Sequence, residues 1–337
     1  MISKFKIFLG QMQHMSFKRW FLHVDQIHRY AGISKPRILM DMIWCELRYG
    51  IGYLDYNVYG FARRRGPIRK TYMTARDNIM LTRSLNKSEH SNIVNDKLTF
   101  YKTFKDYIGR DFIDLRDTDS AGLEAFCRGK EAVFSKPLDS CGGNGVRKII
   151  VTDTTDYPML YKDLMKSKNF DVEDALIQHP EMNKLCPDCV NTLRIVTLNT
   201  PKGVLVLYVI LRIGLGGKPI DNISGGGMYT RLYGKEITRP AFSDKTAKKY
   251  TSHPMTGTKL IGFTIPYYDE AIALAIQAAE SVKDKLGYIG WDIGITVNGP
   301  AIVEGNDLPG YDMCQNSIHA DEGIRPKIEE LIGKKLK

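Results

Sequence analysis

"GYIGWDIGITVNGPAIVEGNDLPG", residues 287–310, contains two short apolar runs around an Asn-Gly pair, and each run carries polar residues that a plain core strand would lack. The pattern predicts a β-hairpin. A two-residue turn would pair Val297 with Pro300, but proline has no backbone N–H to close that turn. We therefore expect a three-residue loop that pairs Val297 with Ala301.

This register places three polar side chains on one face of the hairpin. Asp292 lies opposite Asn306, and Glu304 lies two residues before Asn306, so all three share a face. Two carboxylates and an amide are oxygen ligands that suit Mg²⁺, although a solvated polar face of an edge hairpin would show the same pattern. We expect the other face to pack in the core, with Ile293, Ile295, Val297, Ala301 and Val303.

The composition of the 337-residue chain is that of an ordinary globular protein, with 43% hydrophobic and 26% charged residues. Its length allows two or three subdomains. The sequence has no run of 18 apolar residues and no signal-peptide core near its N-terminus, so we expect no membrane span and a cytoplasmic protein. Six dispersed cysteines make no disulfide framework and agree with a reducing compartment.

The formal net charge of +10 indicates an anionic partner. A nucleoside triphosphate, a phosphorylated or acidic glycan, a membrane surface and a nucleic acid all carry such charge. The basic residues are dispersed except for clusters such as "FARRRGPIRK" at 61–70, which we interpret as a solvated loop. With no recognised nucleic-acid module, we expect no nucleic-acid partner, while a peripheral membrane contact and the oligomeric state stay open.

Three segments follow one another along the chain. Residues 1–95 look largely helical, residues 96–180 pass from a helix into strands around a Gly-rich turn, and residues 181–337 supply longer strands. In the last segment we expect "VNTLRIVTL" and "VLVLYVILRIG" to form a hairpin, and the amphipathic helix "YDEAIALAIQAAESVKDKLG" to end at Gly287 as a C-cap. The order predicts an α+β fold with a mostly antiparallel sheet.

A lysine precedes a glycine-rich turn in "VFSKPLDSCGGNGVRKI". Lys136 ends one predicted strand, and Gly142, Gly143 and Gly145 come before the next. Such a loop lets backbone N–H groups approach a phosphate while the lysine adds a positive charge. The spacing fits neither a Walker P-loop nor a Rossmann fingerprint, and a plain hairpin is the alternative.

The segment "LIQHPEMNKLCPDCVNTLRIVTL" joins the middle and last segments. Residues 176–181 run from an apolar strand end through a His-Pro turn, which could hinge two lobes and offer backbone groups to an adenine edge. Cys186 and Cys189 form a CxxC pair without the second pair of a zinc site, so we interpret them as buried or loop thiols.

A second polar, glycine-rich stretch is "LRIGLGGKPIDNISGGGMYTRL". Arg212 could bind a carboxylate or phosphate, and backbone at glycines 225–227 could approach a ligand, although a long polar turn is an equal reading. We interpret His253 in "SHPMTG" as a surface-loop histidine, with an acid, base or substrate contact as the alternative.

Taken in order, these parts resemble the ATP-grasp superfamily: a lysine before a Gly loop, a hinge with a glutamate, and a hairpin with Asp followed by Glu-x-Asn. More narrowly, "DMIWCELRYGIGYLDY", "NDKLTFYKTF", "NTLRIVTL", "DNISGGG" and the opening hairpin resemble the sugar-transfer-associated ATP-grasp proteins of surface-glycan biosynthesis. The resemblance spans roughly residues 35–320. It implies two α+β lobes that grip ATP, preceded by a mostly helical region.

The resemblance also implies roles for individual residues. Those implied to bind ATP are Lys97, Lys136, Ser140, Gly142, Gly143, Gly145, Gln178, His179 and Glu181. Those implied to hold two Mg²⁺ ions, with Mn²⁺ able to substitute, are Asp292, Glu304 and Asn306. Those implied to face the transferred phosphoryl group or the substrate are Arg194, Arg212 and Asn222.

The implied reaction is an ATP-dependent ligation of a carboxylate to an amine through an acylphosphate, attaching an amino acid or similar carboxylate to a sugar or glycan precursor. An ATP-dependent phosphotransferase acting on a sugar hydroxyl and a non-catalytic accessory protein that binds nucleotide or glycan are the alternatives. Gly290 stands where some amino-acid ligases place an arginine, and "QHPE" replaces two adjacent acidic residues in the hinge. These departures leave the substrate side open.

Overall fold

A computed structural model describes residues 17–137, 145–217, 226–246 and 248–336. The chain divides into two compact units, one of residues 1–84 together with 308–337 and the other of residues 85–307. The C-terminal end of the predicted third segment therefore belongs with the N-terminal helices. No helix among the described residues is long and apolar enough to cross a membrane.

The unit of residues 1–84 and 308–337 is helical, as expected for the N-terminal region. Its core is built from aromatic and aliphatic side chains of the first helices, including Ile27, Met42, Tyr56 and Phe61. The elements of this unit are α2 (Phe17–Ala31), α3 (Lys35–Tyr49), α4 (Tyr53–Val58), η1 (Gly66–Thr71), α5 (Ala75–Leu85), η5 (Met313–Gln315) and α12 (Arg325–Ile332).

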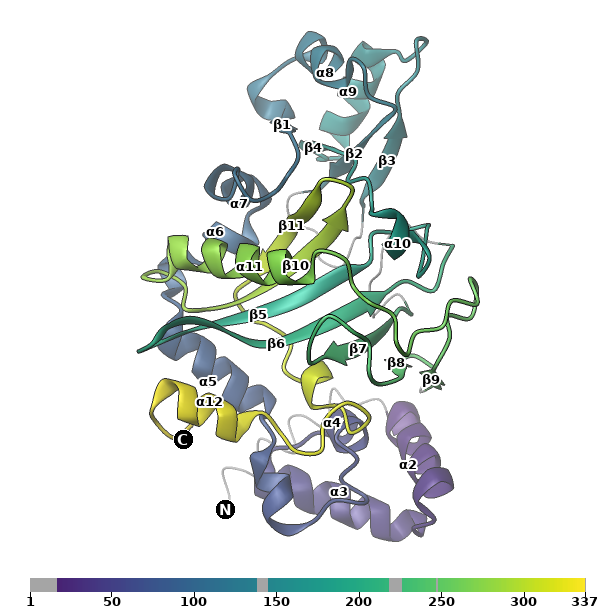
Figure 1. The fold of residues 1–337 in the computed structure, drawn as a ribbon, viewed down its shortest axis with the longest axis vertical. Coiled ribbons are helices and arrows are strands. Elements are labelled where there is room, and N and C mark those ends of the chain that lie inside the picture. The colour runs from purple at the N-terminus through teal and green to yellow at the C-terminus, as the bar shows by residue number, and fades with distance from the viewer. Residues whose placement is uncertain (1–16, 138–144, 218–225, 247, 337) are drawn as a thin grey trace. The chain divides into compact units, whose positions relative to one another are not determined.

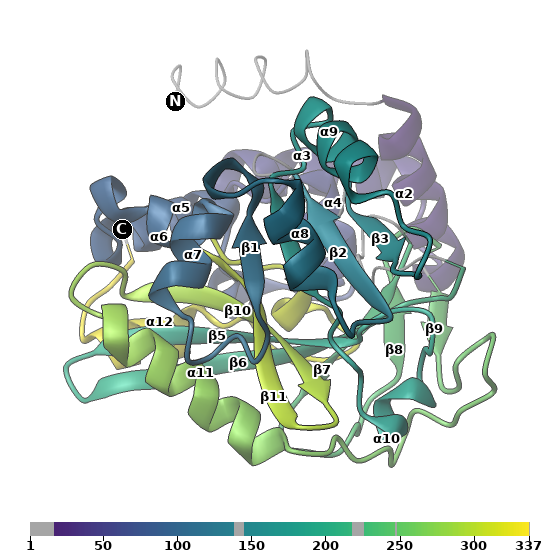
Figure 2. The ribbon, with the colours of Figure 1, turned by 90° about the horizontal axis from the view of Figure 1, so that it is seen from above.

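The unit of residues 85–307 contains a four-stranded antiparallel sheet of order β1-β4-β2-β3. Helices α8 and α9 cover one of its faces (Figure 2), where Leu123 and Leu164 pack with Val133 and Val172. The elements between residues 88 and 174 of this unit are η2 (Ser88–His90), α6 (Asn92–Asn95), α7 (Lys97–Thr103), β1 (Phe112–Asp114), η3 (Leu115–Asp117), α8 (Ser120–Cys127), β2 (Ala132–Lys136), β3 (Arg147–Ile150), α9 (Tyr157–Lys166) and β4 (Asp171–Asp174).

A seven-stranded antiparallel sheet of order β11-β10-β5-β6-β7-β8-β9 forms the rest of this unit (Figure 1). The expected hairpin of two long strands is confirmed by the pairing of β5 with β6. The elements are α10 (Pro180–Asn183), β5 (Thr192–Thr200), β6 (Gly203–Ile213), β7 (Met228–Leu232), β8 (Ala241–Ser243), β9 (Lys248–Tyr250), α11 (Tyr268–Val282), β10 (Tyr288–Thr296) and β11 (Gly299–Asn306).

Helix α11 packs against β5, β6, β10 and β11 through a stripe of small residues. Ala271, Ala275 and Ala278 are fully buried, and their short side chains allow a close approach to the sheet. The expected end of this helix at Gly287 is wrong, because the helix ends at Val282. A Cβ atom at Gly287 would lie 3.1 Å from the carbonyl oxygen of Leu85, so the close backbone contact favours glycine at this position.

The hairpin of β10 and β11 forms, but its predicted register is wrong. Thr296 pairs with Gly299 across a two-residue loop, and Ile295 pairs with Pro300. The missing N–H of Pro300 leaves no unpaired acceptor, because the carbonyl of Ile295 accepts a hydrogen bond from the backbone N–H of His179 at 2.9 Å. A bulge after Asp292 then shifts the register by one residue.

The bulge also changes the apolar face of β11. Ile302 lies opposite Ile293 and is fully buried, whereas Val303, which was expected in the core, is only partly buried. Val297, at the tip, is 42% exposed instead of packed in the core. The core side of this hairpin is therefore made mainly by β10, all of whose residues are buried.

Candidate functional site

The hairpin brings two carboxylates and an amide to one face of the seven-stranded sheet. Asp292 pairs directly with Glu304. Asn306 pairs with Gly290, two residues before Asp292, so it shares their face. Asp292 is buried, whereas Glu304 is open to solvent on one side. The face predicted from the sequence is thus the face observed, although the pairing differs.

Two arginines from the neighbouring strands hold Asp292. Arg194 of β5 lies directly across from it and forms a two-pronged ion pair, with Nη2 donating to Oδ2 at 2.8 Å and Nε donating to Oδ1. Arg212 of β6 places Nη2 2.9 Å from the same Oδ2 and donates from Nε to the hydroxyl of Thr192 at 3.0 Å. Two positive side chains, on β5 and β6, therefore lie beside the carboxylate on β10.

The surrounding charges shift the pKa values of Asp292 and Glu304 in opposite directions. Burial opposes ionisation of Asp292, but the Arg194 and Arg212 guanidiniums more than offset it and hold the pKa of Asp292 well below its usual range. Glu304 is otherwise surrounded by protein, and this desolvation together with the adjacent Asp292 carboxylate raises the pKa of Glu304 to about 7. A bound cation would relieve that repulsion.

The donor set fits Mg²⁺, which takes carboxylate and amide oxygens and leaves further positions for water and phosphate. Within the described residues, no group of three or more His, Cys, Asp or Glu side chains is placed to hold a metal ion. The fit therefore depends on the mixed set of Asp292, Glu304 and Asn306.

A second charged cluster lies on the other face of the four-stranded sheet, opposite the face that packs against α8 and α9. The ammonium of Lys136, the last residue of β2, forms an ion pair with Glu173 of β4 and lies 3.4 Å from the Tyr101 hydroxyl. Arg110 donates from Nε to Glu173 at 2.8 Å, and the Tyr101 hydroxyl also donates to Glu173. Burial opposes ionisation of Glu173, but Arg110 and Lys136 lower the pKa of Glu173 to about 2.

Arg110 connects the Lys136 cluster to the β10–β11 hairpin, which carries Asp292 and Glu304. Its Nη1 donates to the carbonyl of Ile302 at 2.8 Å, and its Nη2 donates to the carbonyl of Val303 at 3.2 Å. Val303 directly precedes Glu304 in β11. One buried guanidinium thus fixes the strand that carries Glu304 relative to the strand that carries Glu173.

Asp171 adds an unpaired carboxyl to the same face. It lies opposite Lys136 in the register of β2 and β4, and it is fully buried. Neither of its carboxyl oxygens has a hydrogen-bond partner among the described residues. Burial, with a contribution from the Glu173 charge, raises the pKa of Asp171 to about 7.

We expect Asp171→Asn to stabilise the protein at pH 8 and to have little effect at pH 4. Because the folded-state pKa is raised, Asp171 loses its stabilising contribution as the pH rises from about 4 through about 7, and asparagine does not ionise. The gain at pH 8 should be about 1–3 kcal/mol, because only aspartate must ionise at this buried position and asparagine stays neutral. Thermal unfolding at both pH values tests this, with Asp153→Asn, at an exposed loop position, as the control. Equal effects of Asp171→Asn at the two pH values would contradict it.

Lys97 and Gly145 both lie next to Pro137, directly after β2. The Lys97 ammonium donates to the carbonyl of Pro137 at 2.6 Å, directly after Lys136. Gly145 has a positive φ of 77°, and a Cβ there would lie 2.6 Å from the Pro137 ring, so only glycine fits. The predicted lid residues Ser140, Gly142 and Gly143, like Asn222, lie outside the described residues.

The family of the chain follows from its sequence. A family model described as sugar-transfer associated ATP-grasp matches residues 76–332, which is more than half of the chain. This chain belongs to the sugar-transfer associated ATP-grasp family. The resemblance inferred from its motifs is confirmed, as is the expected α+β ATP-grasp fold. No curated protein matches the chain.

Solved structures with partial likeness include other ATP-grasp proteins. The ATP-grasp ligase PsnB, complexed with minimal precursor, Mg and ADP, is 13% identical with a TM-score of 0.43, over 74% of this chain and 61% of that chain. The D-alanine–D-alanine ligase from Bacillus anthracis is 13% identical with a TM-score of 0.38, over 65% of this chain and 58% of that chain. The chain thus matches about three-fifths of the length of these proteins.

In this ATP-grasp protein, the Gln178 side chain holds together the segment that connects β4 with β5. Its amide nitrogen donates to the carbonyls of Cys186 and Cys189, each at 3.0 Å, and to the Asn183 side chain at 2.8 Å. Its amide oxygen accepts from the backbone N–H of Asn191 at 2.6 Å. The side chain of Gln178 is therefore engaged inside the protein, and the groups that the connection offers to a ligand are those of its neighbours.

His179 and Glu181 lie at the start of α10. The backbone N–H of Glu181 donates to His179 Nδ1 at 3.1 Å, which caps the helix, and the His179 ring meets the Tyr267 ring edge-on at 5.7 Å. Glu181 is exposed and pairs with Lys184 at 2.7 Å. Its carboxylate is thus available to solvent, as a ligand to ribose hydroxyls requires.

Two smaller predictions concern the CxxC pair and His253. Cys186 and Cys189 are buried free thiols whose sulfurs lie 3.5 Å apart, as the interpretation of buried or loop thiols requires. The prediction of a surface histidine is wrong, since His253 is 1% exposed. Its Nε2 lies 2.7 Å from the Gly214 carbonyl, and its Nδ1 accepts from the N–H groups of Met255 and Thr256. Both nitrogens thus hold the loop together.

Three residues that sequence reasoning missed take part in the charged clusters of this ATP-grasp protein: Arg110, Asp171 and Glu173. The alternation of acidic and apolar residues in "FDVED" was a usable signal, because it places Asp171 and Glu173 on the face opposite Val172. Arg110 had no such signal. Its partners Ile302 and Val303 are more than 190 residues away in sequence.

Proposed function

We propose that this chain is an ATP-dependent carboxylate–amine ligase that attaches an amino acid or similar carboxylate to an amino or uronic sugar of a surface-polysaccharide precursor. The observation that carries the proposal is the joining of two charged clusters by Arg110. One cluster holds the Lys136 cation, and the other holds Asp292 and Glu304 beside two arginines. Membership of the sugar-transfer associated family supports the choice of a sugar acceptor.

The nucleotide would lie between these clusters. Lys136 and Lys97 would bind phosphate oxygens, and the loop of residues 140–145 would cover them. The connection that the Gln178 side chain holds in place would offer His179 and Glu181 to adenine and ribose. Asp292, Glu304 and Asn306 would hold Mg²⁺, with two ions expected and Mn²⁺ able to substitute. A metal ion held there would neutralise part of the phosphate charge.

The remaining steps use this chain's own residues as positioning and charge-stabilising groups. A substrate carboxylate oxygen attacks the γ-phosphorus of ATP, ADP leaves, and an amine then displaces phosphate from the acylphosphate and loses a proton. Arg194, Arg212 and Asn222 would face the transferred phosphoryl group or the substrate carboxylate, where cations stabilise the shared negative charge. No covalent protein nucleophile is required.

The cellular setting is part of the same proposal. ATP and activated sugar precursors are cytoplasmic metabolites, so we place the protein in the cytoplasm, with small-molecule partners and no nucleic acid. The basic N-terminal region leaves room for peripheral contact with the membrane on which such precursors are assembled.

Product analysis tests the proposal. Purified protein with ATP and Mg²⁺ is screened for ADP release against pools of amino acids, amino sugars and uronic sugars. A ligase releases ADP and free phosphate in equal amounts with an amide product detected by mass. Phosphate retained on a sugar product would favour the phosphotransferase. ATP binding without turnover in any pool would favour the accessory protein.

A further inference from the structure

The unit of residues 1–84 and 308–337 contains a cavity of its own, about 470 Å³ in volume. This volume lies in the range of small-molecule sites. Among the described residues that line the cavity, five are cationic and one is acidic: Arg48, Arg69, Lys70, Arg325, Lys335 and Glu329. No residue proposed to bind ATP belongs to this unit, and part of the lining precedes the stretch that the family model matches.

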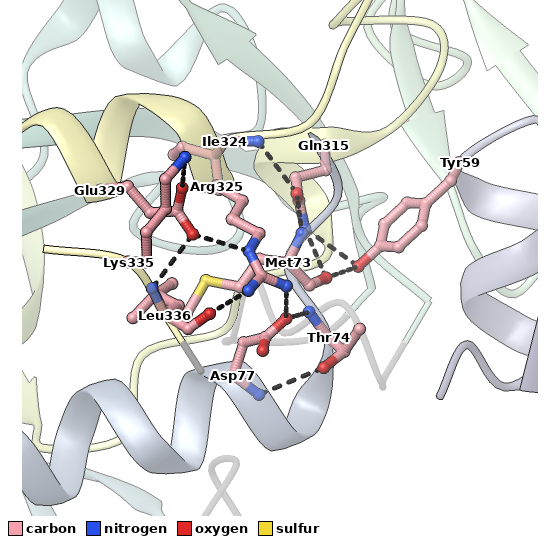
Figure 3. Close-up of polar contacts among 10 residues, drawn as sticks. All are labelled: Tyr59, Met73, Thr74, Asp77, Gln315, Ile324, Arg325, Glu329, Lys335 and Leu336. Carbon is pink, nitrogen blue, oxygen red and sulfur yellow. Dashed lines mark hydrogen bonds and ion pairs between the residues drawn. The ribbon is translucent and has the colours of Figure 1, made fainter. Parts of the chain in front are cut away.

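The acidic member of the lining is already paired. Glu329 accepts from Arg325 Nε at 3.0 Å, from the backbone N–H of Leu336 at 3.0 Å, and pairs with Lys335 at 3.2 Å (Figure 3). Arg325 also contacts Asp77 at 3.4 Å. These contacts fold the C-terminal residues back onto α12 and build one wall of the cavity from fixed side chains.

A second cation of the lining, Arg69, is neutralised by Asp41, which does not itself line the cavity. Arg69 is 3% exposed and forms a two-pronged ion pair with Asp41, at 2.8 and 2.5 Å. It also donates to the carbonyl of Phe61 at 2.6 Å. Arg69 therefore belongs to the framework of the unit.

Arg48 and Lys70 are different. Neither forms an ion pair within the part of the chain that the structure describes, and both line the cavity. The Arg48 guanidinium lies 5.6 Å from the centre of the Tyr49 ring, which also lines the cavity and orients that side chain. The lining holds five cationic side chains, and three carboxylates contact them: Asp41, Asp77 and Glu329. Two positive charges of the lining are therefore left without a counter-charge.

We propose that this cavity is a second ligand site, which binds the phosphate or carboxylate group of a small polar molecule, such as a sugar phosphate or sugar acid, through Arg48 and Lys70. Arginine and lysine both recognise such oxyanions, and a cavity of this size holds more than the anionic group alone. The proposal concerns binding only and does not rest on the proposed ligase activity.

Calorimetric titration of the full chain tests the site. The probes are inorganic phosphate, glucose 6-phosphate and glucuronate, with glucose as the uncharged control. We expect saturable binding of a charged probe and none of glucose. Arg48→Gln and Lys70→Gln should each weaken binding by about tenfold, the effect of losing one charge-assisted hydrogen bond. Binding of phosphate-bearing probes alone identifies phosphate as the recognised group, and binding of glucuronate alone identifies carboxylate.

Two further variants keep the result specific. Arg37→Gln removes an exposed cation from the same helix, α3, outside the cavity, and should leave the affinity unchanged. Lys136→Met, in the other unit, should also leave it unchanged, which separates this site from the proposed ATP site. The proposal is overturned if no charged probe binds saturably, if Arg37→Gln weakens binding as much as Arg48→Gln, or if Lys136→Met abolishes it.

Discussion

Lys136→Met is expected to reduce ATP turnover by about 10²–10³-fold, the effect of removing one preorganised charge-stabilising group. The methionine keeps most of the length of the side chain but leaves the phosphate charge without its cation. Glu173 remains paired with Arg110 and hydrogen-bonded to Tyr101, so the fold should still unfold cooperatively. ATP affinity by calorimetry and ADP release measure the two effects separately.

The matched control for this change is Lys148→Met. Lys148 belongs to the same hairpin, on β3, but its side chain is exposed. We expect its ATP affinity and turnover to match the wild type. If Lys136→Met also turned over ATP at the wild-type rate, the Lys136 cluster would not be the phosphate site, and the proposed function would lose its main support.

Glu304→Gln is the second change with a large expected effect. It keeps the size of the side chain and removes the charge that a divalent cation requires, so Mg²⁺-dependent ATP turnover should be lost. The fold should not suffer. Desolvation and the nearby Asp292 carboxylate raise the pKa of Glu304 to about 7, so above that pH the wild-type protein carries a repulsion that glutamine removes.

Two measurements separate these effects. Turnover is followed at increasing Mg²⁺ concentration, and the melting temperature is measured at pH 8, where that of Glu304→Gln should equal or exceed the wild-type value. Glu270→Gln, at an exposed position in the first turn of α11, serves as the control and should change neither. Normal turnover of Glu304→Gln at ordinary Mg²⁺ concentrations would show that the hairpin carboxylates do not hold the metal.

The polar face of the hairpin was predictable even though its register was not. The predicted pairing opposed Asp292 to Asn306, and the observed pairing opposes it to Glu304. The two registers differ at this point by two residues, which is one full period of side-chain alternation, so the same three side chains share a face in both. The two-residue turn was not predicted because the Ile295 carbonyl accepts its hydrogen bond from the distant backbone N–H of His179, and no local sequence pattern indicates that contact.

The burial of individual polar side chains, such as His253 and Arg110, was harder to predict from the sequence. His253 looked like a surface histidine because its neighbours are polar and small, yet backbone groups of its own loop and of Gly214 satisfy both ring nitrogens. Arg110 looked like one of many dispersed cations, yet its guanidinium is almost fully buried against Glu173 and β11. These two side chains can be buried because hydrogen-bond and ion-pair partners satisfy their polar groups. Several of those partners come from remote parts of the chain.

The sequence by itself determined the strands and helices, the antiparallel hairpins, the position of Lys136 at a strand end and the shared face of Asp292, Glu304 and Asn306, because each depends on periodicity and turn chemistry within a few residues. Only the tertiary structure decided which charges meet. It joined Glu173 to Lys136, Arg110 to the strand of Glu304, and the C-terminal residues to Arg325. Ion pairs between distant residues form where packed elements bring their side chains within a few ångströms, and that proximity is a property of the folded chain.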